Sequence, residues 1–213
     1  MDCDQKSSAN EKPHPYLCFV IEETLASRFF FLLQKGVTIE GHVGCSINTF
    51  LSKEMGVGPE TIEKIQSIFL DGSPVDDLDS AMIKDGATLA LSAAMPGLVG
   101  ATMRRGGAYS SFRSTITYHE INSECVPGEG LVHLKLFNLL MAELGPGLLK
   151  KGVFVRSSDL TEFLSGQSAD FWKGCKQILI NGNPAGKGIT EVNAYISQHD
   201  QVFFSVAEVK EDV

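Results

Sequence analysis

His42 and Cys45 are the first residues along the chain whose types and spacing could do chemistry. They are spaced His-x-x-Cys, and imidazole nitrogen and thiolate sulfur are ligands that Zn²⁺ prefers. Two ligands do not close a tetrahedral site and no second pair lies nearby in the sequence, so we predict no metal site. Cys45 also precedes the expected helix cap Ser46, where a helix N-terminus lowers the pKa of a thiol. No histidine has a recognisable partner spacing, so we interpret Cys45 as a small buried hydrophobic residue.

The five cysteines do not indicate a disulfide framework, because their number is odd and no two are spaced Cys-x-x-Cys. Thiols of this kind fit a reducing compartment, so we expect a cytoplasmic protein. Residues 1–15 are polar without an apolar core, which predicts a disordered tail rather than a secretory signal. The longest apolar stretch, residues 29–33, is far shorter than the roughly 20 residues that span a bilayer. We therefore expect neither a membrane partner nor a cofactor.

The chain has 213 residues and a formal net charge of −8. This acidic balance argues against nucleic acid as the main partner. The one basic cluster consists of Arg104, Arg105 and Arg113. It suits an anion or an acidic partner, but we favour a solvated loop.

The segment from residue 95 onward is rich in glycine and apolar residues. It lacks the lysine and the Ser/Thr of a phosphate-binding loop, whereas an exposed apolar loop indicates a protein contact. We therefore name as candidate interaction residues Met95, Pro96, Gly97, Leu98, Val99, Arg104, Arg105, Gly106 and Gly107. No motif places a nucleophile, a base and an orienting group together, so we name no catalytic residue.

Three blocks of the sequence recur in the same order. Residues 32–39 (LLQKGVTI) match 148–155 (LLKKGVFV), residues 47–52 match 160–165, and residues 68–74 (IFLDGSP) match 178–184 (ILINGNP). The partners are separated by 116, 113 and 110 residues, so a few residues were gained or lost between blocks. Two copies indicate duplication of a folding unit rather than a solenoid, which needs at least three stacked repeats.

The elements that must position the candidate residues can be predicted in each copy from alternation, capping and turn signals. In the second copy we expect strand 131–137, a turn at 145–147, strand 151–156, a helix capped by Ser158 or Asp159, strand 177–180, a hairpin turn at Asn181-Gly182, a short connector near 189–196 and strand 201–206. In the first copy we expect strands 18–22 and 37–40, a helix capped by Ser46, strand 68–70, a hairpin turn at Asp71-Gly72 and strand 88–91.

These patterns predict an α+β protein of two tandem units, each a mixed sheet packed against one main helix. We place the first domain at residues 16–103, a Gly/Arg-rich linker at 104–114 and the second domain at 115–213. Residues 114–120 could instead add an edge strand.

Several motifs resemble the β-grasp (ubiquitin-like) sulfur carriers, namely the small subunit of molybdopterin synthase and the thiamine-biosynthesis sulfur carrier. Residues 132–140 (VHLKLFNLL) resemble the opening strand of this family, residues 69–75 (FLDGSPV) its hairpin, and residues 84–91 (KDGATLAL) its closing strand. The resemblance covers roughly 70 residues of each copy, in pieces, and implies the fold more strongly than the function.

The family's chemistry uses a free C-terminal Gly-Gly, whose lack of side chains lets the tail enter a narrow enzyme site. The first copy continues past Leu91 as SAAMPGL, and the second copy ends in KEDV, so neither end fits. Residues 104–107 (RRGG) resemble the Arg-Gly-Gly tail of ubiquitin, but we favour a flexible linker because glycine pairs mark loops.

We therefore expect a non-enzymatic protein-interaction module whose partner is another protein, associated by resemblance with a sulfur-transfer or cofactor-biosynthesis pathway. One alternative is a carrier or modifier activated by cleavage after Gly107. Another is an enzyme with a site between the two copies, for which His119, Asp200 and Cys45 are the residues to substitute.

Overall fold

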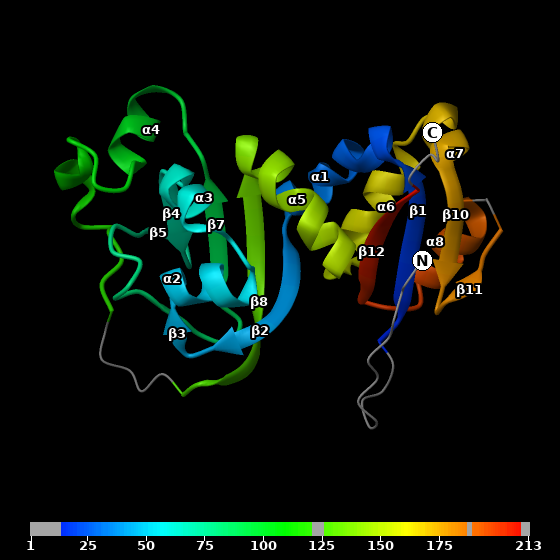
Figure 1. The fold of residues 1–213 in the computed structure, drawn as a ribbon, viewed down its shortest axis with the longest axis horizontal. Coiled ribbons are helices and arrows are strands. Elements are labelled where there is room, and N and C mark those ends of the chain that lie inside the picture. Colours follow the sequence, from blue (N-terminus) through cyan, green and yellow to red (C-terminus); the bar gives the residue numbers. More distant parts are fainter. Residues whose placement is uncertain (1–13, 121–125, 187–188, 210–213) are drawn as a thin grey trace.

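Ten strands of the chain form a single mixed sheet. The computed structural model describes residues 14–120, 126–186 and 189–209, and their fold is α+β, as expected (Figure 1). In spatial order the strands are β11 (Asn183–Pro184), β10 (Cys175–Ile180), β1 (Tyr16–Glu22), β12 (Gln201–Val209), β9 (Val153–Arg156), β2 (Val37–Val43), β8 (Gly128–Phe137), β7 (Thr88–Ser92), β4 (Ser67–Leu70) and β5 (Ser73–Pro74). A separate small sheet pairs β3 (Cys45–Ser46) with β6 (Met82–Ile83).

Helices fill the connections between these strands. They are η1 (Glu23–Phe29), α1 (Phe30–Lys35), α2 (Ile47–Thr49), η2 (Phe50–Glu54), α3 (Pro59–Lys64), α4 (Gly97–Met103), η3 (Ser110–Arg113), α5 (Leu139–Lys151), α6 (Ser157–Ser165), α7 (Ala169–Gly174) and α8 (Ile189–Ile196). Each copy therefore carries several helices rather than one main helix. The expected disordered tail lies outside the described residues up to residue 13, and so does the KEDV terminus.

The two copies of the sequence repeat have the same order of elements. Apart from η1, β3, η2 and β6 in the first copy and α8 in the second, the first runs β1, α1, β2, α2, α3, β4, β5 and β7, and the second runs β8, α5, β9, α6, α7, β10, β11 and β12. Both expected hairpin turns are present, because Asp71 and Gly72 have φ of 49° and 82°, and Asn181 and Gly182 have φ of 49° and 79°. These left-handed conformations are what a tight two-residue turn requires.

The opening strand of each copy lies among the strands of the other copy. β8 lies between β2 and β7, antiparallel to the former and parallel to the latter. β1 lies between β10 and β12, antiparallel to the former and parallel to the latter. We call β2, β8, β7, β4 and β5 the first half of the sheet, and β9, β12, β1, β10 and β11 the second half. Each half therefore contains four strands of one copy and the opening strand of the other copy.

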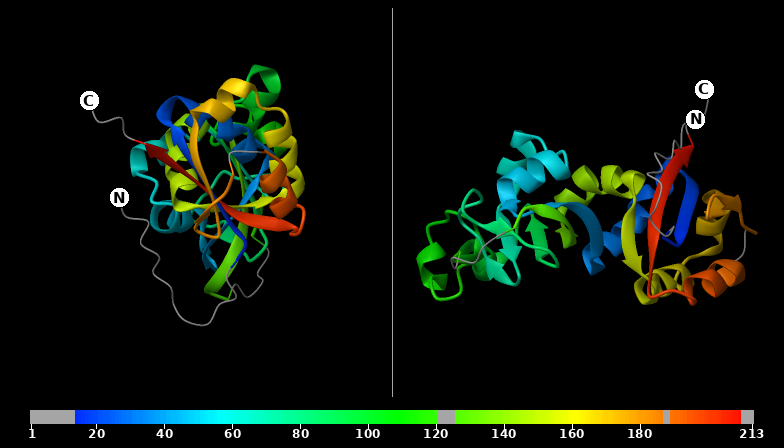
Figure 2. Two further views of the ribbon diagram at one scale, coloured as in Figure 1. Left: turned by 90° about the vertical axis from the view of Figure 1, so that its right-hand side faces the viewer. Right: turned by 90° about the horizontal axis from the view of Figure 1, so that it is seen from below.

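The two halves are joined into one sheet at the pair Thr38 and Phe154, on β2 and β9. Figures 1 and 2 show the halves side by side along the longest axis of the molecule. Because the strands form one continuous sheet, the two expected units do not appear as two separate sheets.

The predicted turn at residues 145–147 is wrong, because these residues lie inside the 13-residue helix α5. A side chain on Gly145 would come within 2.8 Å of Phe30 and 2.9 Å of Leu33, so glycine lets α5 pack closely against α1. Tertiary packing therefore outweighs the local turn signal of Gly-Pro-Gly. The following strand begins at Val153, two residues later than expected, because Lys151 ends the helix and Gly152 follows with φ of 95°.

The helix expected after a cap at Ser158 or Asp159 begins earlier, at Ser157. The Asp159 carboxylate accepts a hydrogen bond from Arg156 Nε at 2.8 Å rather than capping the backbone. The connector near residues 189–196 is present as α8.

Residues 104–120, expected as a linker with an optional edge strand, fold against the first half of the sheet. They contain η3 and a series of turns, and residues 114–120 form no strand. The Tyr118 backbone N–H nevertheless donates to the Pro74 carbonyl at 2.8 Å, so this segment lies against edge strand β5.

Both edges of the sheet are short and contain proline. β5 consists of Ser73 and Pro74, and β11 of Asn183 and Pro184. Proline has no N–H to donate to a ladder, and short edge strands are one way in which proteins prevent edge pairing.

Candidate functional site

Helix α4 holds the apolar part of the predicted interaction segment. The chain leaves β7 at Ser92, and Asn138 Nδ2 donates to Ser92 Oγ at 3.0 Å and to the Ala94 carbonyl. Gly100 is buried, and a Cβ at that position would collide with the Met95 carbonyl. The segment that precedes α4 is therefore folded tightly onto the helix, which requires a glycine at this position.

The exposed side of α4 is apolar. Leu98 and Val99 are 74% and 62% exposed. Phe112 on the neighbouring η3 and Leu139, the residue after Asn138, are also largely exposed. Contiguous exposed apolar side chains are uncommon on a soluble protein unless they contact something. The segment expected as an apolar loop is thus a short helix, and its Leu98 and Val99 are exposed.

An apolar groove of about 330 Å³ lies between Met95, which precedes α4, and the outer face of the first half of the sheet. It is lined by Phe69, Ala90, Leu91, Ser92, Met95, Phe137 and Asn138. Phe69 pairs with Ala90 and Ser92 pairs with Phe137 across neighbouring strands, so the lining side chains form two adjacent rows. We call Leu98, Val99 and this groove the α4 surface.

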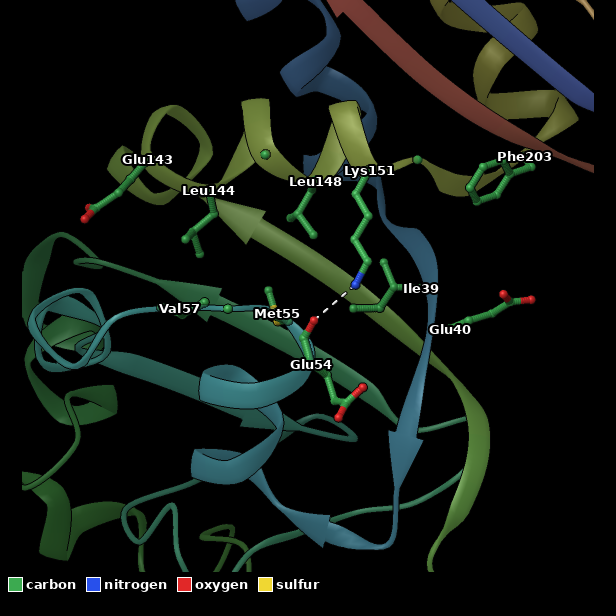
Figure 3. A pocket seen from close by; sticks show the side chains of 13 residues that line it. Ile39, Glu40, Glu54, Met55, Val57, Glu143, Leu144, Leu148, Lys151 and Phe203 are labelled. Atoms are coloured by element: carbon green, nitrogen blue, oxygen red, sulfur yellow. Dashed lines mark hydrogen bonds between the residues drawn. The ribbon is translucent and has the colours of Figure 1, made fainter. Parts of the chain in front are cut away.

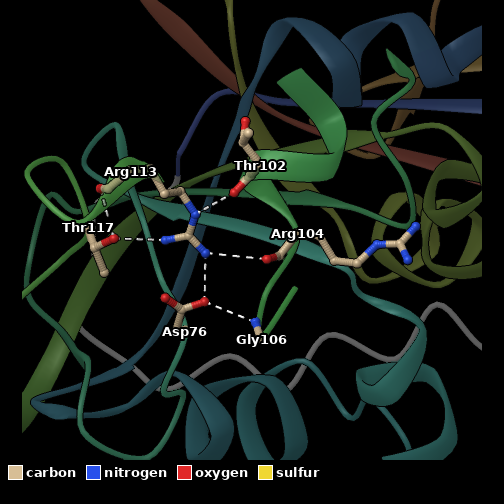
Figure 4. Close-up of polar contacts among 6 residues, drawn as sticks. All are labelled: Asp76, Thr102, Arg104, Gly106, Arg113 and Thr117. Atoms are coloured by element: carbon tan, nitrogen blue, oxygen red, sulfur yellow. Dashed lines mark hydrogen bonds and ion pairs between the residues drawn. The ribbon is translucent and has the colours of Figure 1, made fainter. Parts of the chain in front are cut away.

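Arg113 fixes α4 and the segment that follows it. Its side chain is only 2% exposed and donates four hydrogen bonds (Figure 4). Nε reaches the Thr102 carbonyl at 2.7 Å, and Nη1 reaches Thr117 Oγ1 at 2.8 Å. Nη2 reaches Asp76 Oδ1 at 2.6 Å and the Arg104 carbonyl at 3.4 Å. The prediction of a solvated loop is therefore wrong for Arg113, because this guanidinium cross-links three segments of the chain.

Asp76 is the acidic partner in this network. Partial burial raises its pKa, but hydrogen bonds from Arg113 and from the Gly106 N–H, together with the charges of Arg113 and Arg105, outweigh burial. The pKa of Asp76 therefore lies below its usual value, and the carboxylate is ionised at neutral pH.

Residues 104–107 are held by their backbones. The Arg105 N–H donates to the Gln66 carbonyl at 2.7 Å, the Gly106 N–H to Asp76 Oδ1 at 3.0 Å and the Gly107 N–H to the Arg104 carbonyl at 3.1 Å. The Arg104 side chain is exposed and points away from Asp76 (Figure 4). The structure thus brings the predicted apolar and basic residues together around α4.

A second cavity, of about 360 Å³, lies where the two halves of the sheet meet (Figure 3). Its walls come from β2, α5, the end of η2 with the chain that follows it, and Phe203 of β12. Lys151 spans it, with Nζ donating to the Glu54 carbonyl at 3.2 Å. Glu143, at its end, accepts hydrogen bonds from Thr61 and Lys64. None of His119, Asp200 and Cys45 lines this cavity, so the residues named for an enzyme between the copies are not brought together there.

His42 and Cys45 do not form part of a metal site in the described part of the chain, where no group of three or more potential ligands occurs. Cys45 is half-buried, and its Sγ donates to the His42 carbonyl at 3.4 Å. His42 Nδ1 lies 3.3 Å from Glu129 Oε1 at the surface. Cys175 is buried, and burial raises the pKa of its thiol to about 11.

The groove residues Phe69, Ala90 and Phe137 were missed by the sequence reasoning. A usable signal exists, because Phe69 stands between two core residues of β4 and Phe137 follows one in β8, so both face outward by alternation. A large aromatic residue at an outward position of a strand marks an apolar outer face.

The helices of residues 14–120, 126–186 and 189–209 include none long and apolar enough to cross a membrane. No protein-family model matches the chain, and no curated protein and no solved structure shows significant similarity to it.

Proposed function

We propose that this chain is a non-enzymatic protein-interaction module of two β-grasp (ubiquitin-like) units that have exchanged their opening strands. Read outward from the junction, each half has antiparallel, parallel, antiparallel and antiparallel strand pairs in that order. In each copy a helix follows the second strand, α2 after β2 and α6 after β9. The halves differ in one respect: the opening strand β8 lies beside the second strand β2 in the first half, whereas in the second half the closing strand β12 lies beside β9 and the opening strand β1 lies beyond it. A five-stranded mixed sheet with this helix is the β-grasp arrangement that the sequence motifs resemble.

The α4 surface is the observation that carries the functional part of the proposal. Leu98 and Val99 are exposed to solvent, and Met95, just before them, lines a preformed apolar groove. The buried Arg113 network holds α4 in place. A rigid exposed apolar patch lowers the cost of ordering a binding surface when a partner docks. Keeping such a patch without a partner would favour aggregation.

Docking by strand addition to the sheet is less favourable in this fold. Edge strand β5 is covered by the hydrogen bond from Tyr118 to Pro74, and β11 contains Pro184. A partner therefore gains more from side-chain contacts on the α4 surface than from backbone pairing at an edge.

The pathway part of the proposal, sulfur transfer or cofactor biosynthesis, is supported by the sequence resemblance alone. The proposal takes the chain to act intact, because a cut after Gly107 would separate Arg113 from the α4 segment that it fixes. Intact-mass measurement of the native protein checks this point. A fragment ending at Gly107 would favour the alternative of a carrier with a diglycine end.

The test uses three forms of the chain as bait and compares which proteins each captures from extracts of native cells. The wild type and Val126→Ser, a control that changes an equally exposed apolar residue elsewhere, should retain the same protein partner. Leu98→Ser/Val99→Ser should lose it, because the change removes the apolar contact without altering charge. A partner retained equally by all three chains, or no partner for the wild type, contradicts the proposal.

A further inference from the structure

The groove on the α4 surface has a size and a lining that suit large apolar side chains. Its volume of about 330 Å³ lies at the lower end of the roughly 300–1,000 Å³ typical of ligand sites. Phe69, Ala90, Met95 and Phe137 are among the residues that line it. Such a groove accepts one or two apolar side chains of a peptide rather than a cofactor.

Basic residues lie on elements next to this groove, although the whole chain carries a net charge of −8. Lys135 on β8 pairs directly with Ala90 of the groove wall, and its side chain lies beside Gly36, which precedes β2. Arg104 and Arg105 follow α4, and the Arg105 backbone is bonded to Gln66, next to the strand that carries Phe69. Among the described residues, none of these three cations takes part in an ion pair with a carboxylate.

The carboxylate beside Arg105 is already engaged. Asp76 Oδ1 accepts hydrogen bonds from both Arg113 and the Gly106 N–H. Arg105 helps to keep Asp76 ionised but makes no direct contact with it. The basic side chains are therefore left to attract negative charge from outside the chain.

We propose that the α4 surface binds a peptide segment of a partner protein that carries one large apolar side chain flanked by Asp or Glu residues. The apolar side chain enters the groove and packs against Leu98 and Val99. The flanking carboxylates pair with Lys135 on one side and with Arg104 and Arg105 on the other. This inference rests on the proposed function and names the class of its partner.

A peptide fits these observations better than the surface of an anionic membrane. The apolar lining is concave, so it receives a protruding side chain, whereas a bilayer is contacted by protruding apolar residues. The net charge of −8 also repels an anionic surface as a whole, whereas a short acidic segment meets only the local basic side chains.

The experiment pans a random 12-residue peptide display library against the full-length wild type and, in parallel, against Leu98→Ser/Val99→Ser. Peptides enriched on the wild type alone should contain a large apolar residue with at least two Asp or Glu nearby. A labelled enriched peptide is then titrated by fluorescence polarisation at 50 and 500 mM NaCl. Lys135→Glu and Arg104→Glu should each weaken it about fivefold at low salt and much less at high salt. Lys53→Glu, which reverses an exposed cation on η2, should leave the affinity unchanged.

The outcomes separate this inference from the proposed function. If the enriched peptides lack acidic residues but still require Leu98 and Val99, the inference is overturned and the proposed docking surface is retained. Peptides that bind the wild type and Leu98→Ser/Val99→Ser equally overturn both. Binding of the wild type, but not of that variant, to phosphatidylserine vesicles with no peptide enrichment overturns the peptide in favour of a membrane.

Discussion

Replacing Arg113 by methionine tests whether this buried cation fixes the candidate site. Methionine keeps much of the aliphatic volume of arginine but donates no hydrogen bond. Arg113→Met therefore leaves the Thr102 and Arg104 carbonyls and the Asp76 carboxylate without their shared donor. The perturbation is confined to the contact between α4, the segment after it and the chain after β5.

The expected loss follows from the burial of the two partners. Removing one member of a buried, hydrogen-bonded ion pair costs about 3–5 kcal/mol. Arg113 is 2% exposed, but the Asp76 side chain is 37% exposed and regains water when the guanidinium is lost. We therefore expect a loss of about 2–3 kcal/mol in the free energy of unfolding.

Urea unfolding at pH 7, followed by circular dichroism, measures this loss. Lys173→Met is the matched control, because it removes a cation from an exposed pair with Asp170 and should cost about 0–1 kcal/mol. Hydrogen exchange gives a local measure, since the amides of residues 105–107 should lose protection in Arg113→Met only. Equal stability of the two variants, with unchanged exchange at residues 105–107, would refute the structural role of Arg113.

The same network predicts a pH dependence with a defined sign. The pKa of Asp76 is lowered in the folded chain, so its contribution is present above the unfolded value of about 4 and is lost as pH falls through the folded value. The stability difference between the wild type and Asp76→Asn should therefore shrink on acidification from pH 6 to pH 3. A difference that stays constant over that range contradicts the ionised pair.

Three further results are expected. Fragments 1–107 and 108–213 should each fail to show cooperative unfolding alone and should regain it on mixing, because each lacks a strand that its half of the sheet needs; a fragment that folds alone would indicate independent domains. Gly100→Ala should destabilise the chain by about 1–3 kcal/mol through its collision with a backbone carbonyl, whereas Gly147→Ala in α5 has open space and should be neutral or stabilising by up to about 1 kcal/mol, as urea unfolding will show. Cys175 should resist alkylation at pH 8 until the chain is unfolded, because its thiol is buried with a pKa of about 11; modification in the folded state, detected by peptide mass spectrometry, would contradict that burial.

Local signals were sufficient to predict the elements whose structure depends on a few neighbouring residues. Both hairpin turns, at Asp71-Gly72 and Asn181-Gly182, follow from residues that tolerate positive φ between two β-forming runs. The apolar character of the segment around Leu98 and Val99 could also be read from the sequence, whereas their exposure is a result of the structure. Internal repetition identified equivalent elements without any knowledge of their spatial arrangement.

Long-range packing decided the features that were predicted wrongly. Gly145 and Pro146 are turn-forming residues by composition, yet they lie in α5 because α1 packs against the space left by the missing side chain. Arg113 looks like a surface residue in a Gly- and Ser-rich segment. Its burial depends on Asp76, 37 residues earlier in the chain, and on carbonyl groups that no sequence pattern marks.

The sequence alone determined the repeat, the α+β composition and the presence of an apolar, glycine-rich segment with basic residues. Only the tertiary structure decided that β1 lies in the second half of the sheet and β8 in the first, that the strands form one sheet and that Met95, just before α4, lines an apolar groove. The physical reason is that alternation records which face of a strand is buried but not which strand lies beside it. Since backbone hydrogen bonds are the same for every partner, the choice of neighbour rests on packing between residues far apart in the chain.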